Sequence, residues 1–111
     1  MANSLLEKHC QRETRRLESD EAGTLIAQIH GDWSTSNEGL AIQRSFRFSN
    51  YYQTIAFVNA LAWVAHREDH HPDLEVGYNR CLVRFSTHSV GGLSENDFIC
   101  AARIDALNND D

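Results

Sequence analysis

The chain has 111 residues, of which 41% are hydrophobic, and it carries a formal net charge of −6 at pH 7. These values suit a single domain and disfavour a nucleic-acid partner, because contact with phosphates requires a basic surface. No stretch reaches the ~20 consecutive apolar residues that span a bilayer, and the N-terminus lacks the apolar core of a secretory signal. We therefore expect a cytoplasmic protein with no nucleic-acid or membrane partner.

The chain begins with a charged segment in which apolar positions are sparse. We expect residues 1–20 to form a flexible N-terminal extension and residues 21–111 to form one domain. Within that domain, apolar residues recur at helical spacing over residues 21–30. The pattern predicts a short amphipathic helix that stops near Gly31.

A β-hairpin is predicted next. Trp33–Thr35 begins a strand, Ser36–Gly39 is a turn signal, and Leu40–Phe48 alternates apolar and polar residues as the return strand. Arg44 interrupts the apolar face of this strand, and we expect it at the rim of that face.

A long amphipathic helix follows the hairpin. Apolar residues recur at helical spacing from Tyr51 to about residues 66–68, and Ser49 or Asn50 can cap the helix start. The helix must end before Pro72, because proline disfavours helical geometry in the residue that precedes it.

Two more strands and a last helix complete the domain. Leu74–Tyr78 and Cys81–Phe85 alternate as strands joined by a tight turn. A polar loop over residues 86–94 leads to a helix that Ser94 opens, with Asp97 as an acidic variant of the capping box. This order predicts an α+β fold, a four-stranded antiparallel sheet with three helices packed on one face as a two-layer sandwich.

The segment HREDHHPDLEVGY, residues 66–78, is the densest group of titratable side chains in the chain. His70 and His71 stand directly before Pro72, where a break in the backbone lets the two imidazoles point in different directions. The hairpin of the last two strands would return His88 to the same edge of the sheet. We therefore expect three imidazoles near one another.

Three interpretations compete for these histidines. Imidazoles with the carboxylate of Asp97 are ligand types of a zinc or iron site, but the spacing matches no zinc motif, so we expect no metal. Imidazole titrates near neutral pH and can serve as a general acid or base. The third interpretation is that the histidines complement a helix dipole at the surface, which we favour for His66 and leave open for the others.

The three cysteines, Cys10, Cys81 and Cys100, are far apart and form no CxxC pair. An odd number of cysteines in a reducing compartment predicts free thiols. Cys81 and Cys100 lie in apolar stretches, so we expect them in the core.

The segment from His66 to Asp97 resembles the signature region of the pterin-4a-carbinolamine dehydratase family. The resemblance covers roughly residues 20–107 and includes Trp33, Phe46 and Phe48. The positions that carry the signature are His66, His70, His71, Pro72, Tyr78, His88 and Asp97.

The resemblance implies a lyase that dehydrates 4a-hydroxytetrahydrobiopterin to quinonoid dihydropterin and water. Such an enzyme recycles the tetrahydropterin of aromatic amino-acid hydroxylases, which would be its partners in the reaction sequence. The pterin would be the substrate, so no cofactor is expected, and the chain would assemble as a homodimer or homotetramer. The alternative is a non-catalytic pterin-binding module, or a protein-interaction module similar to a transcriptional coactivator.

By the same resemblance, His70, His71 and His88 are the catalytic residues. Loss of water needs a proton on the departing hydroxyl and removal of the N5 proton, which an imidazolium and a neutral imidazole can provide. We expect His70 and His88 to exchange protons and His71 to position or protonate the hydroxyl. Asp97 would orient or charge a neighbouring imidazole. Ser86, Thr87 and Ser89, in the loop after the fourth strand, would bind the pterin through backbone groups. The implied substrate-binding set is Pro72, Ser86, Thr87, Ser89 and Asp97.

Overall fold

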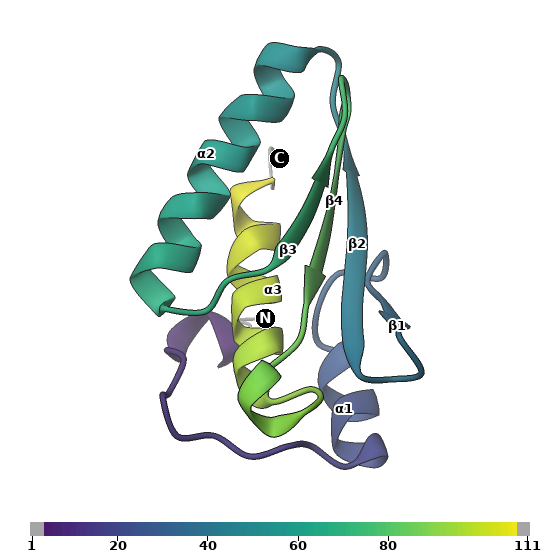
Figure 1. The fold of residues 1–111 in the computed structure, drawn as a ribbon, viewed down its shortest axis with the longest axis vertical. Helices are drawn as coiled ribbons and strands as arrows, with labels where there is room; N and C mark the ends of the chain where they lie inside the picture. The colour runs from purple at the N-terminus through teal and green to yellow at the C-terminus, as the bar shows by residue number, and fades with distance from the viewer. Residues whose placement is uncertain (1–3, 109–111) are drawn as a thin grey trace.

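In a computed structural model, which describes residues 4–108, three α-helices and four strands form two layers (Figure 1). Helices α2 and α3 lie across one face of the sheet, and α1 packs near the start of α3. The predicted α+β fold is confirmed. Residues 1–3 of the predicted extension and residues 109–111 of the predicted domain lie outside the described residues. The elements are η1 (Ser4–Glu7), α1 (Ser19–Ile26), β1 (Ser34–Ser36), β2 (Ala41–Arg47), α2 (Tyr51–Glu68), β3 (Asp73–Val76), β4 (Arg80–Phe85), η2 (His88–Val90) and α3 (Glu95–Leu107).

The sheet has the strand order β1-β2-β4-β3, and all neighbouring strands are antiparallel. Ile42 on β2 pairs with Phe85 on β4, and Asp73 on β3 pairs with Arg84 on β4. The first residue of β3 therefore lies beside the end of β4. As predicted, the two loops that carry the histidines leave the sheet at the same end.

The hydrophobic core lies between the sheet and the helices. Burying one large apolar side chain contributes about 1.5–3 kcal/mol, so this layer is the main source of stability. Within residues 4–108, no helix combines the length and apolar character that crossing a membrane requires. The large side chains that are almost fully buried in the core include Leu5, Ile42, Phe46, Leu61, Val83, Phe85, Phe98, Ile99 and Ile104.

Arg44 is buried in the apolar face of β2, so its expected position at the rim of that face is wrong. Its Nη1 donates to Asp105 Oδ1 on α3 at 2.7 Å, and its guanidinium lies 4.2 Å from the ring centroid of Phe46. Trp33 Nε1 donates to the same carboxylate at 2.8 Å. Asp105 therefore supplies the counter-charge that allows an arginine inside this layer.

Helix α1 begins and ends earlier than the predicted range 21–30. At its start, the Glu18 N–H donates to the side chain of Glu21 at 2.8 Å, which satisfies a backbone group that the helix leaves free. At its end, the backbone turns away after Ile26, and Ile29 reaches the core from the following turn. The helical spacing of the apolar residues thus continued past the helix itself.

Strand β3 ends at Val76, short of the predicted end at Tyr78. The Gly77 N–H donates to the Arg80 carbonyl at 2.8 Å and closes the turn. Tyr78 is exposed, and its ring stacks on that of Tyr51 with centroids 6.3 Å apart.

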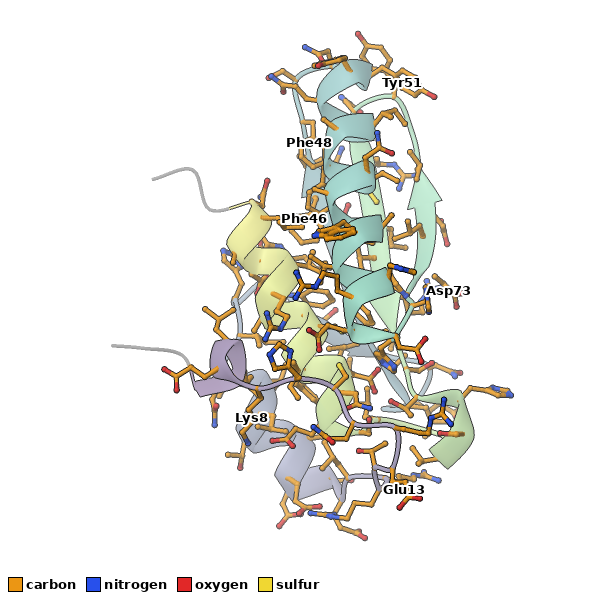
Figure 2. All side chains as sticks on the ribbon, turned by 90° about the vertical axis from the view of Figure 1, so that its left-hand side faces the viewer. Lys8, Glu13, Phe46, Phe48, Tyr51 and Asp73 are labelled. Atoms are coloured by element: carbon orange, nitrogen blue, oxygen red, sulfur yellow. The ribbon has the colours of Figure 1, made fainter. Side chains whose placement is uncertain are left out.

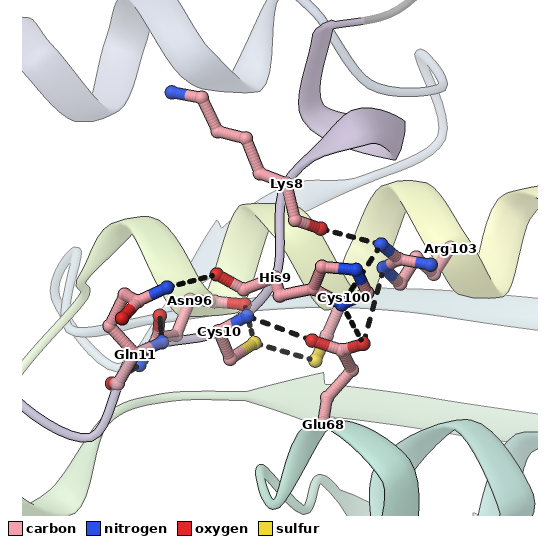
Figure 3. Close-up of polar contacts among 8 residues, drawn as sticks. All are labelled: Lys8, His9, Cys10, Gln11, Glu68, Asn96, Cys100 and Arg103. Atoms are coloured by element: carbon pink, nitrogen blue, oxygen red, sulfur yellow. Dashed lines mark hydrogen bonds and ion pairs between the residues drawn. The ribbon is translucent and has the colours of Figure 1, made fainter.

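The N-terminal segment, residues 4–18, lies across the start of α3 and the end of α2 (Figures 2 and 3). The Gln11 N–H donates to Asn96 Oδ1 at 3.0 Å, and Asn96 Nδ2 donates back to the Gln11 carbonyl at 2.8 Å. The Cys10 N–H donates to Glu68 Oε1 at 2.8 Å. These polar contacts connect the segment to both helices.

Two leucines attach the same segment to the core. Leu5 is only 1% exposed, and Leu17 packs against the core while its N–H donates to the Leu93 carbonyl at 2.8 Å. The flexible extension predicted for residues 1–20 therefore has defined contacts from residue 5 onward. Its flexibility stays a prediction, which disulfide formation and hydrogen exchange can test.

Disulfide formation between Cys10 and Cys100 can test where the N-terminal segment docks. All three cysteines are free, and the sulfur atoms of Cys10 and Cys100 lie 3.4 Å apart. A hydrogen bond with Cys10, together with burial, raises the pKa of the Cys100 thiol, so we expect slow oxidation. Treatment with diamide, which takes up the two thiol hydrogens, should join Cys10 to Cys100 in a disulfide that peptide mass spectrometry identifies.

The matched variants separate this pair from the third cysteine. Cys81→Ser should still form the disulfide, whereas Cys10→Ser should not. If wild type remains a free trithiol in diamide while unfolded chain is oxidised, the docked position of Cys10 is wrong.

Glu68 should make the docking of the segment depend on pH. Burial acts to raise the pKa of Glu68, but the Cys10 N–H, the hydrogen bond with His9 and the charge of Arg103 together hold it below its ordinary value of 4.5. A carboxyl group with a lowered folded-state pKa stabilises the fold above its unfolded pKa, and this stabilisation is lost as pH falls through the folded value.

We therefore expect hydrogen exchange at the Cys10 amide, corrected for its intrinsic rate, to accelerate as pH drops below 4.5. Glu68→Gln should be less protected at neutral pH and should lack the acid-dependent step. Equal protection in both proteins at every pH would show that Glu68 does not hold the segment.

Candidate active site

The C-terminal end of α2 sets the direction of His70. Asp69 adopts a left-handed conformation, with φ 53° and ψ 43°. Its N–H donates to the His66 carbonyl at 3.2 Å, and the His70 N–H donates to the Ala65 carbonyl at 3.1 Å. This pair of bonds is a Schellman motif, which turns the chain out of the helix. The turn that directs His70 is thus complete before Pro72.

The imidazole of His70 is held on two sides. Its Nε2 lies 2.6 Å from Asp97 Oδ1, and because a carboxylate can only accept, Nε2 is the donor. Its ring stacks on Phe85, the last residue of β4, with centroids 5.8 Å apart and planes 6° apart. The His70 side chain is 12% exposed and the Asp97 side chain is fully buried. A small part of the imidazole therefore remains exposed.

Asp97 serves α3 as well as His70. Its Oδ2 accepts from the Ser94 N–H at 3.0 Å, which completes the capping box predicted for this helix. The same oxygen accepts from the Thr87 hydroxyl at 2.8 Å. Both oxygens of the carboxylate are thus occupied by donors.

The loop after β4 closes on itself. The Thr87 N–H donates to the Gly92 carbonyl at 2.8 Å, and the Gly92 N–H donates back at 3.4 Å. The backbone groups of Thr87, which we expected to bind a pterin, are therefore paired within the loop, and its side chain is buried. Ser86, His88 and Ser89 are exposed around this closure.

His71 and His88 extend the site toward solvent. Each follows a residue of the buried network, His71 after His70 and His88 after Thr87, and both are exposed. Neither imidazole has a hydrogen-bond or ion-pair partner among residues 4–108. Hydrogen bonds join His70 and Thr87 each to Asp97, whereas His71 and His88 are placed near them only by their position in the chain at the same end of the sheet.

A comparison with known protein families shows which family the chain belongs to. Residues 15–107 match the family described as "Pterin 4 alpha carbinolamine dehydratase". The chain belongs to this family. The resemblance seen in the sequence is confirmed, and so is the assignment of the chain to a family of enzymes named for a hydro-lyase reaction.

Individual pterin dehydratase relatives cover most of the chain. A protein from Nitrosomonas eutropha (strain DSM 101675 / C91 / Nm57) is 54% identical over 100 residues, which are 90% of this chain and 87% of that protein. Its name assigns it, provisionally, as a pterin-4-alpha-carbinolamine dehydratase. The similarity leaves little of either chain unmatched.

Two solved structures share the pterin dehydratase fold. One is described as a transcriptional coactivator/pterin dehydratase from Brucella melitensis, with a TM-score of 0.79, 31% identity, and coverage of 84% of this chain and 98% of that one. The other is described as a pterin dehydratase-like protein that is a RuBisCO assembly factor in the alpha-carboxysome, with a TM-score of 0.63, 28% identity, and coverage of 74% and 95%.

Other signature residues of the pterin dehydratase pattern lie outside the hydrogen-bonded network. His66 is exposed in the last turn of α2, with its ring centroid 6.4 Å from that of Trp63. Pro72 is partly buried immediately before β3. Within residues 4–108, no group of three or more histidine, cysteine or acidic side chains is arranged to hold a metal ion.

Two side-chain contacts of the site were missed in the sequence, the stacking of His70 on Phe85 and the hydrogen bond from the Thr87 hydroxyl to Asp97, although Thr87 itself was expected in the site through its backbone. The alternation of β4 placed Phe85 on the core face, but nothing in the pattern indicated that an imidazole stacks on it. The hydroxyl of Thr87 reaches Asp97 only because the loop closes at Gly92, and no local sequence signal indicates that closure.

Proposed function

We propose that this protein is a pterin-4a-carbinolamine dehydratase that removes water from 4a-hydroxytetrahydrobiopterin. The observation that supports this most is the hydrogen-bonded pair of the partly buried His70 and the buried Asp97, 2.6 Å apart, at the sheet end from which His71 and His88 emerge. Family membership makes a pterin carbinolamine the natural substrate of such a site.

The reaction needs one proton donor and one proton acceptor. The C4a–O bond breaks and the hydroxyl leaves as water after it gains a proton. The N5–H bond breaks, and its electron pair forms the C4a–N5 double bond. No electron enters or leaves, so the stoichiometry needs no redox carrier, and we propose that the pterin is substrate with no additional cofactor.

The three histidines divide this work. His70 donates Nε2–H to Asp97, so it removes the N5 proton through Nδ1. His71 protonates the departing hydroxyl, and His88 carries the proton from His70 back to His71. A positioned acid or base of this kind contributes about 10²–10⁴-fold in rate. Pro72, Ser86 and Ser89 contact the pterin, the two serines through backbone groups.

The reaction that supplies the substrate indicates where the enzyme acts. A 4a-hydroxypterin is left when an aromatic amino-acid hydroxylase has used its tetrahydropterin, so we propose that this protein acts directly after such a hydroxylase in the cytoplasm. We also propose a homodimer or homotetramer, as the family resemblance implies.

The test is a coupled reaction in which an aromatic amino-acid hydroxylase generates the carbinolamine. Adding the purified protein should accelerate formation of quinonoid dihydropterin above the rate with buffer alone. The same rate with and without protein would contradict the dehydratase proposal.

A second candidate function is a protein-interaction role without turnover. The descriptions of the two solved relatives include a coactivator and an assembly factor, and on this chain α2 exposes the aromatic side chains of Tyr52 and Trp63. A protein that fails the dehydratase assay but binds a pterin product in a titration would be a non-catalytic pterin-binding module. A protein that shows neither turnover nor pterin binding would have the interaction role.

A further inference from the structure

A continuous chain of hydrogen bonds connects the first turn of α3 to His70. The Asn96 N–H donates to Ser94 Oγ at 3.2 Å, and Ser94 Oγ lies 2.6 Å from Thr87 Oγ1. Thr87 Oγ1 donates to Asp97 Oδ2 at 2.8 Å, and Asp97 Oδ1 accepts from His70 Nε2 at 2.6 Å. Thr87 stands in the middle of this chain and does not touch His70 in it.

The direction of every bond in this chain follows from the number of hydrogens available. A hydroxyl group has one hydrogen, and that of Thr87 goes to Asp97. The short contact between the two hydroxyls must then use the hydrogen of Ser94. Ser94 is free to donate it, because its own oxygen accepts from the Asn96 N–H. The network therefore has one consistent arrangement, with all donors pointing toward Asp97.

Burial makes this arrangement difficult to replace. Thr87 is 5% exposed, and Ser94 and Asp97 are fully buried. Water cannot easily take over a lost bond in such a place, so a buried group that loses its partner carries the full cost of desolvation.

We propose that Thr87 is a positioning residue whose hydroxyl orients the Asp97 carboxylate, so that Asp97 keeps the Nε2–H tautomer of His70 and leaves Nδ1 as the proton acceptor. The effect on turnover rests on the proposed dehydratase function, whereas the effect on the tautomer of His70 does not. This role differs from the backbone contact to pterin expected for Thr87, because those backbone groups are paired with Gly92.

Loss of the Thr87 hydroxyl has two consequences in this arrangement. Asp97 Oδ2 keeps the Ser94 N–H as its other donor, so the carboxylate gains freedom to rotate and its bond to His70 weakens. The Nδ1–H tautomer of His70 then becomes populated, and it carries a proton on the nitrogen that must accept one. Catalysis falls while pterin binding through other residues is retained.

Two matched pairs of proteins isolate the hydroxyl. Wild type and Thr87→Val have nearly the same shape and differ in the hydroxyl. Thr87→Ser and Thr87→Ala both lose the methyl group and again differ in the hydroxyl. Thermal unfolding shows which variants fold, and if Thr87→Val does not fold, the serine and alanine pair decides by the same measurements.

The first measurement is ¹⁵N NMR of the histidine imidazoles, which distinguishes the two neutral tautomers. We expect His70 to be in the Nε2–H form in wild type and Thr87→Ser, and to contain a substantial Nδ1–H population in Thr87→Val and Thr87→Ala. The same tautomer in all four proteins would overturn the proposal, whether or not the protein is a dehydratase.

The second measurement is the kinetics of carbinolamine dehydration. Thr87→Val and Thr87→Ala should lose roughly tenfold in kcat with KM changed less than about twofold, and Thr87→Ser should recover most of the kcat lost in Thr87→Ala. An equal loss in the serine and alanine variants would overturn the positioning role. If wild type shows the expected tautomer but no turnover, the proposed function fails and the positioning of His70 by Thr87 stands.

Discussion

Replacing His70 with alanine is expected to lower kcat for carbinolamine dehydration by about 10²–10⁴-fold. The imidazole is held between Asp97 and the ring of Phe85, so its position is set before substrate arrives. Alanine removes the proposed acceptor of the N5 proton. The measurement is the steady-state rate of dihydropterin formation by the purified variant.

His30→Ala is the matched control for this change. His30 is an exposed histidine between α1 and β1, outside the two loops that carry His70, His71 and His88. The proposed chemistry does not use it. Its variant should keep kcat within about twofold of wild type. A folded His70→Ala protein that is as active as His30→Ala would remove His70 from the mechanism.

Replacing Asp105 with alanine is expected to reduce the free energy of unfolding by about 3 kcal/mol or more. The change leaves the buried guanidinium of Arg44 without its closest counter-charge, and Trp33 Nε1 without its acceptor. Urea unfolding followed by tryptophan fluorescence measures the loss. A cost this large would be a substantial part of the stability of a domain of this size.

The double variant Arg44→Met with Asp105→Leu tests whether the loss of stability comes from leaving the Arg44 charge unpaired. Removing both charges and filling the space with apolar side chains should recover at least half of the loss, because no buried charge is left unpaired. If Asp105→Ala costs less than about 1 kcal/mol, Arg44 does not depend on Asp105 as the structure indicates.

Much of the fold could be predicted from local patterns. The alternation in β2 and β4 and the helical spacing in α2 follow from burial on one face, a property that a short window of sequence contains. The capping box of Ser94 and Asp97 was also predicted, because its two residues lie within one turn. Family resemblance then selected His70, His71 and His88 from among the six histidines of the chain.

The parts that could not be predicted depend on residues far apart in the chain. Arg44 looked like a rim residue because its partner Asp105 lies on a distant helix. The N-terminal segment looked unattached because Cys10 finds its acceptor on Glu68, at the end of α2. No local period encodes such pairs, and each becomes visible only when the layers are assembled.

The direction of His70 at the end of α2 also could not be predicted from the sequence. Pro72 predicted a break in the helix, but the turn that directs His70 is made by the left-handed backbone of Asp69. Aspartate tolerates that conformation better than most residues, yet it is not the glycine that usually signals a helix end. The proline indicated that the helix ends, and the structure shows how.

The proposal that the pterin binds beside His70, His71 and His88 is tested most directly by NMR of ¹⁵N-labelled histidine. Titrating a stable dihydropterin product analogue into the labelled protein should shift the imidazole resonances of all three residues together, with one affinity. His30 and His66 should not shift with that affinity. If the analogue binds while the resonances of His70, His71 and His88 stay unchanged, the pterin site lies elsewhere and the account is wrong.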